Sequence, residues 1–150
     1  MLWGDGLAVG VSLIDDEHKH LFEILNRLGA LDRNAEARGP DYEQAARGAI
    51  DDLFSYSHYH FSREEELMLD CKCARFPIHK KQHDNFIAMI STIGMKRRDG
   101  GNRLPELAQY VKRWILGHIA ITDKALGEFL RMRIPAENAD FPFNSVYWAC

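Results

Sequence analysis

Histidine and carboxylate side chains recur along this chain at spacings that suit one face of a helix. The patterns are a histidine near the N-terminus, then His-x3-Glu, His-x3-His and His-x4-Asp. They comprise His18, His60, Glu64, His79, His83, His118 and Asp123. Imidazole and carboxylate together suit iron, with manganese or zinc as the alternatives. Five imidazoles and two carboxylates exceed what one tetrahedral zinc ion needs, so the set predicts a pair of ions bridged by carboxylates.

The stretch YSHYHFSREEELM, residues 56–68, combines two histidines with three consecutive glutamates. At about 100° per residue, His60 and Glu64 fall on the apolar stripe that contains Leu53 and Leu67. We therefore expect His60 and Glu64 to point into the core, where a buried carboxylate needs a cationic partner. The other charged side chains of the stretch fall on polar rows and are expected to face water: His58, Glu65 and Glu66.

The apolar spacing is helical almost throughout, and four helices are expected to carry these residues. Asp15 or Asp16 can cap the first helix, which has His18 on its inner stripe and His20 out of phase. The later helices are expected at 40–70, from about 78 to 98, and from 105 to just before Pro135. Short connections between them predict an all-α, antiparallel up-down-up-down four-helix bundle.

One domain is expected over residues 1–150. The bundle would occupy about 15–132, with a non-helical N-terminal arm at 1–14 and a short, aromatic C-terminal tail at 133–150. An apolar fraction of 46%, a charged fraction of 27% and a net charge of −3 are typical of a soluble globular protein. These values give no indication of a nucleic-acid or membrane partner.

The chain has three cysteines, an odd number, which predicts no disulfide framework. Cys71 and Cys73 lie in a predicted loop and are expected to be free thiols, and no further ligand completes a second metal site there. Since no secretory signal opens the chain either, a cytoplasmic location is expected.

Two other metal-binding plans do not fit. The ferritin-like di-iron plan requires Glu-x-x-His pairs, and the nearest match here is Asp15 before His18. The His-Glu-x-x-His pattern of zinc proteases is absent from the sequence.

The segments IDDEHKHLFEILNRL, YSHYHFSREEELM, HKKQH and WILGHIAITD, in this order, resemble the hemerythrin family, most closely the single-domain bacteriohemerythrins. The resemblance runs from about Trp3 to Leu130. It departs from the family at CKCARFP before the third helix and in the tail after Arg131. The resemblance implies that one iron is held by three histidines, the other by two, and that both carboxylates bridge. The three histidines of the first iron would be His79, His83 and His118. The two of the second iron would be His18 and His60, and the bridging carboxylates would be Glu64 and Asp123.

The function that the resemblance implies is reversible dioxygen binding, for oxygen storage, delivery or sensing. The cofactor would be two non-haem iron ions, Fe2+ or Fe3+, with an oxo or hydroxo bridge, and no catalytic residue is expected. An apolar oxygen pocket would be lined by Leu21, Phe61, Trp114, Ile115 and Ile119, although plain core packing explains these residues equally well.

Two alternatives remain open. The first is a di-iron enzyme that handles peroxide or nitric oxide, with Glu65 and His58 as the nearest spare acid–base groups. The second is an oxygen-responsive signalling module that contacts a partner through the aromatic tail. The sequence leaves the protein partner and the oligomeric state open, with a monomer as one option.

Overall fold

The computed structural model describes residues 3–33, 39–98 and 104–133. Its elements are, in order, η1 (Asp5–Leu7), α1 (Ser12–Arg33), α2 (Pro40–Asp70), α3 (Phe76–Arg98), α4 (Leu104–Gly117), η2 (His118–Asp123) and α5 (Lys124–Arg133). Element η1 is a 3-10 turn, η2 is a π-helix, and the described residues contain no strand. The prediction of an all-α chain is confirmed.

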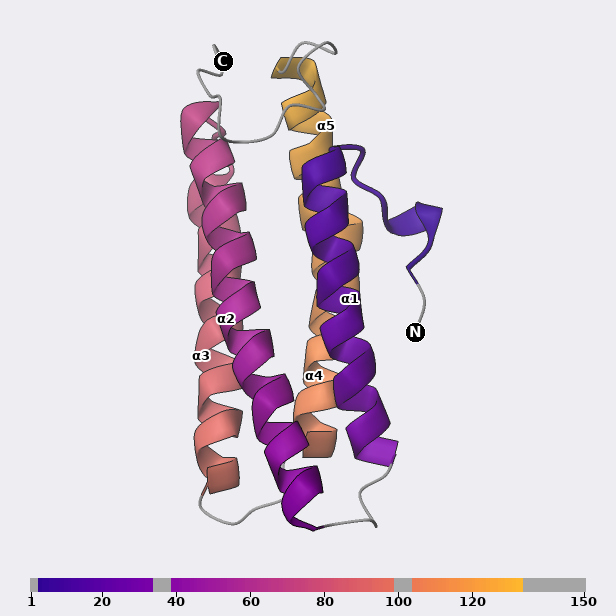
Figure 1. The fold of residues 1–150 in the computed structure, drawn as a ribbon. Helices are drawn as coiled ribbons and strands as arrows, with labels where there is room; N and C mark the ends of the chain where they lie inside the picture. Colours follow the sequence, from indigo (N-terminus) through magenta and orange to yellow (C-terminus); the bar gives the residue numbers. More distant parts are fainter. Residues whose placement is uncertain (1–2, 34–38, 99–103, 134–150) are drawn as a thin grey trace.

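The helices stand as four columns that alternate in direction (Figure 1). Helix α1 runs down in that view, α2 runs up, α3 runs down, and α4, η2 and α5 form one rising column. Each column contacts its neighbours along the chain, and α1 also contacts α4, which closes the ring. The predicted antiparallel up-down-up-down bundle is confirmed.

An apolar core fills the half of the bundle where α1 ends and α2 begins. Leu28, Leu53, Leu107 and Val111 are all fully buried there, one or more from each of three columns. Burying such a side chain contributes about 1.5–3 kcal/mol. This apolar half supplies the stability that allows a cluster of polar side chains to occupy the other half.

Helix α1 begins earlier than the sequence analysis predicts. It starts at Ser12, and Asp15 does not cap it. Instead the Asp15 carboxylate accepts hydrogen bonds from the backbone N–H groups of Val9 at 2.7 Å and Gly10 at 3.0 Å. Asp15 therefore fastens the preceding segment to the first turn of α1.

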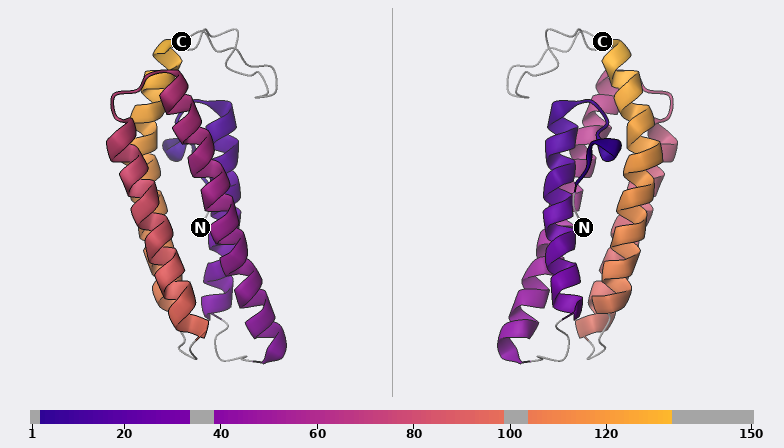
Figure 2. Two further views of the ribbon diagram at one scale, coloured as in Figure 1. Left: turned by 90° about the vertical axis from the view of Figure 1, so that its left-hand side faces the viewer. Right: turned by 90° about the vertical axis from the view of Figure 1, so that its right-hand side faces the viewer.

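The N-terminal arm, residues 3–11, is non-helical apart from η1, as predicted, and is held against α5. Figure 2 shows it over the face formed by α1 and the α4–α5 column. Val9 is buried against Gly127, and Arg131 donates a hydrogen bond to the Val9 carbonyl oxygen. Farther out, the ring of Trp3 packs edge-on against Phe22, with centroids 5.4 Å apart. The predicted C-terminal tail lies outside the described residues.

The loop after α2 corrects the prediction for the cysteines. Cys71 is buried and disulfide-bonded, so it is not the free loop thiol that was expected, whereas Cys73 is free and buried. Spacing along a sequence cannot show which distant thiols fold together. The cysteines therefore give less support to a reducing compartment, and the cytoplasmic location stays a prediction.

Within the described residues, no helix is long and apolar enough to cross a membrane.

Candidate metal centre

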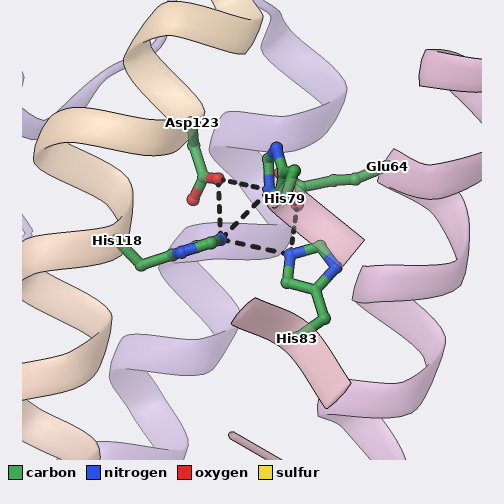
Figure 3. Close-up of side chains that lie close together, drawn as sticks. All are labelled: Glu64, His79, His83, His118 and Asp123. Carbon is green, nitrogen blue, oxygen red and sulfur yellow. Dashed lines mark hydrogen bonds and ion pairs between the residues drawn. The ribbon is translucent and has the colours of Figure 1, made fainter. Parts of the chain in front are cut away.

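The seven predicted ligands come together from all four columns. Five of them form one group (Figure 3). Two histidines form a second group that shares Glu64 with the first. The groups are Glu64, His79, His83, His118 and Asp123; and His18, His60 and Glu64. All seven side chains are buried, with exposed fractions of 6% or less. Within the described residues, the groups that could hold a metal ion contain no cysteine.

Three imidazoles converge on one point through the same ring atom. The Nε2 atom of His118 lies 3.1 Å from Nε2 of His79 and 3.1 Å from Nε2 of His83. Two nitrogens that bind one ion at right angles, each about 2.1 Å from it, are about 3.0 Å apart. The spacing of the three nitrogens therefore suits neighbouring positions on one metal ion.

The two carboxylates each face both histidine groups. Glu64 Oε1 lies 3.8 Å from His18 Nε2 and 3.7 Å from His60 Nε2, while its Oε2 lies 3.5 Å from His79 and 3.3 Å from His83. Asp123 divides its oxygens in the same way. Its Oδ2 is 3.3 Å from His18 Nε2, and its Oδ1 is 3.2 Å from His79 and 3.1 Å from His118. This division is the arrangement that a carboxylate bridging two ions requires.

The π-helix η2 explains how His118 and Asp123 both face inward. At about 100° per residue, five residues of α-helix turn the second side chain about 140° away from the first. A π-helix has i→i+5 hydrogen bonds, which bring residues five apart close to the same face. The sequence analysis predicted one unbroken helix here, and the interruption coincides with the two inward residues.

Two further carboxylates contact the Nδ1 atoms of two of the ligand histidines. Glu17 Oε2 lies 2.9 Å from His60 Nδ1, and Glu65 Oε1 lies 3.0 Å from His83 Nδ1. An acceptor at Nδ1 fixes the ring orientation and leaves Nε2 for a metal ion. Glu17 was missed, although it precedes Leu21 by one helical turn. Glu65 was expected to face water, and this was wrong because its side chain is only 19% exposed.

Glu17→Gln and Glu65→Gln are each expected to weaken metal binding by about 10–100-fold. The amide keeps the size of the side chain but removes the negative charge that makes the imidazole nitrogen a stronger electron-pair donor to the metal ion. Competition against a coloured chelator measures the affinity. Glu66→Gln is the matched control, since Glu66 is exposed beside Glu65, and it should bind metal as the unchanged protein does.

Aromatic rings pack against the ligand histidines. Phe61 stacks on His83 with ring centroids 3.9 Å apart, and Trp114 stacks on His118 at 4.2 Å. The remaining residues of the predicted oxygen pocket, Leu21, Ile115 and Ile119, are buried with exposed fractions of 2–3%. Their role in oxygen binding stays a prediction, but the histidines are shielded from water on this side.

The charges of the cluster oppose the effect of burial. Burial and the charge of Asp123 raise the pKa of the Glu64 carboxyl, but the facing histidines outweigh both and hold it below its ordinary value. Burial lowers the pKa of His79, yet the facing carboxylates of Asp123 and Glu64 raise it to about 9. Without metal, cationic histidine and anionic carboxylates therefore balance one another.

A cation fits the centre better than protons do. Neither nitrogen of His18 makes a hydrogen bond within the described residues, and neither does any carboxylate oxygen of Glu64 or Asp123. Buried polar atoms without partners are costly. Divalent cations among these nitrogens and oxygens would satisfy all of them.

Metal binding is expected to displace a proton from His79. Because its pKa is about 9 in the metal-free protein, His79 is protonated at neutral pH. Its Nε2 can bind a metal ion only after losing that proton. Ferrous iron affinity under nitrogen should therefore rise with pH between about pH 6 and pH 8, by up to about tenfold per unit. Calorimetry in buffers of different ionisation enthalpy would show the proton release, and equal affinity across this range would contradict it.

Comparison with known proteins agrees with this geometry. Residues 9–130 match the family model described as the hemerythrin HHE cation binding domain. A bacteriohemerythrin of Clostridium acetobutylicum is 31% identical, covering 82% of this chain and 95% of that protein. One from Pseudomonas aeruginosa (strain LESB58) is 30% identical, covering 87% and 82%. A crystal structure of wild-type hemerythrin matches with a TM-score of 0.73 at 28% identity, covering 87% of this chain and 97% of that chain.

A four-helix bundle with an inward cluster of histidines and carboxylates defines a cation-binding bundle protein. The chain belongs to the hemerythrin family.

Proposed function

We propose that this protein binds dioxygen reversibly at a pair of non-haem iron ions, for oxygen storage, delivery or sensing. The observation that carries the proposal is the division of the Glu64 and Asp123 oxygens between two histidine groups. With a single ion, the second oxygen of each carboxylate would have no metal ion to bind. The names of the relatives, bacteriohemerythrin and hemerythrin, support the same assignment.

Each iron would have its own histidines. His79, His83 and His118 would hold one, and His18 and His60 would hold the other, with Glu64 and Asp123 bound to both. When bound, the two ions supply the two electrons that reversible dioxygen binding requires. The group of His18 and His60 has one histidine fewer and would leave room for a ligand on its side of the centre.

The protein's own residues would provide orientation and exclusion of water. Glu17 and Glu65 hold one histidine of each group by its Nδ1 atom. Phe61 and Trp114 cover His83 and His118 with their ring faces. An apolar surrounding keeps water and protons from a bound ligand, which favours its release unchanged over loss by reaction.

The two spare acid–base candidates do not favour an enzyme. Glu65 is engaged by His83 and lies 3.6 Å from the Lys80 ammonium. His58 is exposed and packs against Phe54 on the outer side of α2. Neither of them faces the space between the two histidine groups, where a substrate would react.

Metal analysis with absorption spectra tests the proposal. The protein loaded with ferrous iron under nitrogen should carry two ions and be nearly colourless. Air should produce a visible absorption band, and removal of oxygen should reverse it over several cycles. A protein that retains no iron, or whose band never reverses, would overturn the proposal. Turnover of peroxide or nitric oxide well above that of free iron would favour the enzymatic alternative.

A further inference from the structure

Ser57 is a buried polar residue that the metal centre does not explain. The structure describes nine buried polar or charged residues, of which seven are the proposed ligands and Glu17 bonds His60. Ser57 is the ninth. Its exposed fraction is 0%, and its Oγ atom makes no hydrogen bond within the described residues. Burying a hydroxyl without a partner costs free energy, and alanine would fill the position without that cost.

The position of Ser57 follows from the antiparallel register of α1 and α2. His18 packs on His60 with ring centroids 4.9 Å apart, and His20 packs on Tyr56 at 4.3 Å. Position 57 therefore lies close to the level of Leu21. On its own helix Ser57 precedes His60 by three residues and Phe61 by four, so the three side chains share one face.

That level is the apolar layer next to the two-histidine group. Leu21 and Ile115 are buried with exposed fractions of 3% and 2%, and Phe61 contacts Trp114 with ring centroids 5.6 Å apart. In an apolar layer, a single hydroxyl is a strong and selective hydrogen-bond donor.

In the described part of the chain, Tyr42 carries the only other buried hydroxyl without a hydrogen bond. It is 8% exposed and lies near the start of α2, at the end of the bundle opposite the metal centre. None of the seven proposed metal ligands lies near it in sequence. It therefore does not compete with Ser57 as a ligand contact.

We propose that the Ser57 hydroxyl donates a hydrogen bond to a small anionic ligand bound on the His18 and His60 side of the metal centre. This inference rests on the proposed function. Ser57 is a ligand-binding residue, not a metal ligand. Its hydroxyl stabilises the bound anion and does not contribute to the affinity for the metal ions.

Azide binding to the oxidised, iron-loaded protein tests the assignment. A hydrogen bond to a charged group corresponds to roughly a tenfold change in affinity. Ser57→Ala should therefore bind azide about tenfold more weakly, with unchanged iron content. The azide stretching frequency should shift between H2O and D2O in the unchanged protein, and this shift should vanish in Ser57→Ala. Ser57→Thr keeps the hydroxyl and should retain most of the affinity.

Two controls separate ligand binding from a structural role. Ser62→Ala makes the same change at an exposed position of α2 and should leave azide affinity unchanged. In the metal-free protein, Ser57→Ala should be at least as stable to heat as the unchanged protein, because Oγ has no protein partner to lose.

Three results would overturn the inference, and they are distinguishable. If Ser57→Ala binds azide normally while the unchanged protein shows reversible oxygen binding, Ser57 is not a ligand contact and the proposed function stands. If Ser57→Ala destabilises the metal-free protein, the role of Ser57 is structural. If the unchanged protein holds no iron or azide, the proposed function fails and the inference fails with it.

Discussion

His60→Ala should lose the metal ion of the two-histidine group, whereas His58→Ala should keep both ions. His60 is 1% exposed and its Nε2 faces Glu64, while His58 is exposed on the same helix two residues earlier. Removing one of only two histidines leaves His18 and the carboxylates, too few ligands for tight binding. The pair of variants makes the same chemical change on opposite sides of α2.

His60→Ala should also destabilise the metal-free bundle. His60 is the hydrogen-bond partner of Glu17, whose exposed fraction is 6%. Leaving a buried acceptor without its partner costs about 1–3 kcal/mol, and more when the acceptor is charged. Metal content by elemental analysis and urea unfolding of the metal-free protein measure the two effects. Equal metal loss in the two variants would show that the inward assignment of His60 is wrong.

Gly127→Ala should detach the N-terminal arm from α5. A Cβ atom at this position would overlap the Val9 carbonyl oxygen and lie 2.9 Å from the Val9 Cβ. Val9 cannot easily move, because its N–H bonds Asp15 and its carbonyl accepts from Arg131. Relieving the overlap therefore requires loss of the bonds that hold the arm, and with it the packing of Trp3.

Gly48→Ala is the matched control for Gly127→Ala. Both glycines are helical, but no atom lies within 4 Å of a Cβ built at Gly48. Each substitution gains about 1 kcal/mol of helix propensity, so the difference between them reports the overlap alone. Overpacking of this kind costs about 1–3 kcal/mol. The free energies of unfolding of the two variants, measured in urea, should differ by that amount. Equal stability would show that the arm moves away from α5 without a loss of free energy.

The bundle and the inward histidines could be predicted because both depend on local periodicity. His60 and Glu64 follow the same helical phase as Leu53 and Leu67, and all four are buried. Predicting which side chains face inward requires only the pitch of the α-helix, and α2 is α-helical without interruption from Pro40 to Asp70.

What the sequence analysis missed depends on contacts between helices. Glu65 falls on a polar row of its own helix, but α3 brings His83 to it and the pair becomes partly buried. Glu17 reaches His60 across 43 positions of sequence. Asp15 was expected to cap α1, but it holds the arm because Val9 and Gly10 fold back onto it.

The π-helix has a consequence for anyone who wishes to build such a centre from idealised parts. Regular α-helices offer partners three, four or seven residues apart, which is enough for His60 with Glu64 and for His79 with His83. They cannot offer His118 with Asp123. A design assembled only from straight helices would supply six of the seven donors and lack one of the two shared carboxylates. The π-helix His118–Asp123 looks like a defect of the helix, but a design of such a centre must include it.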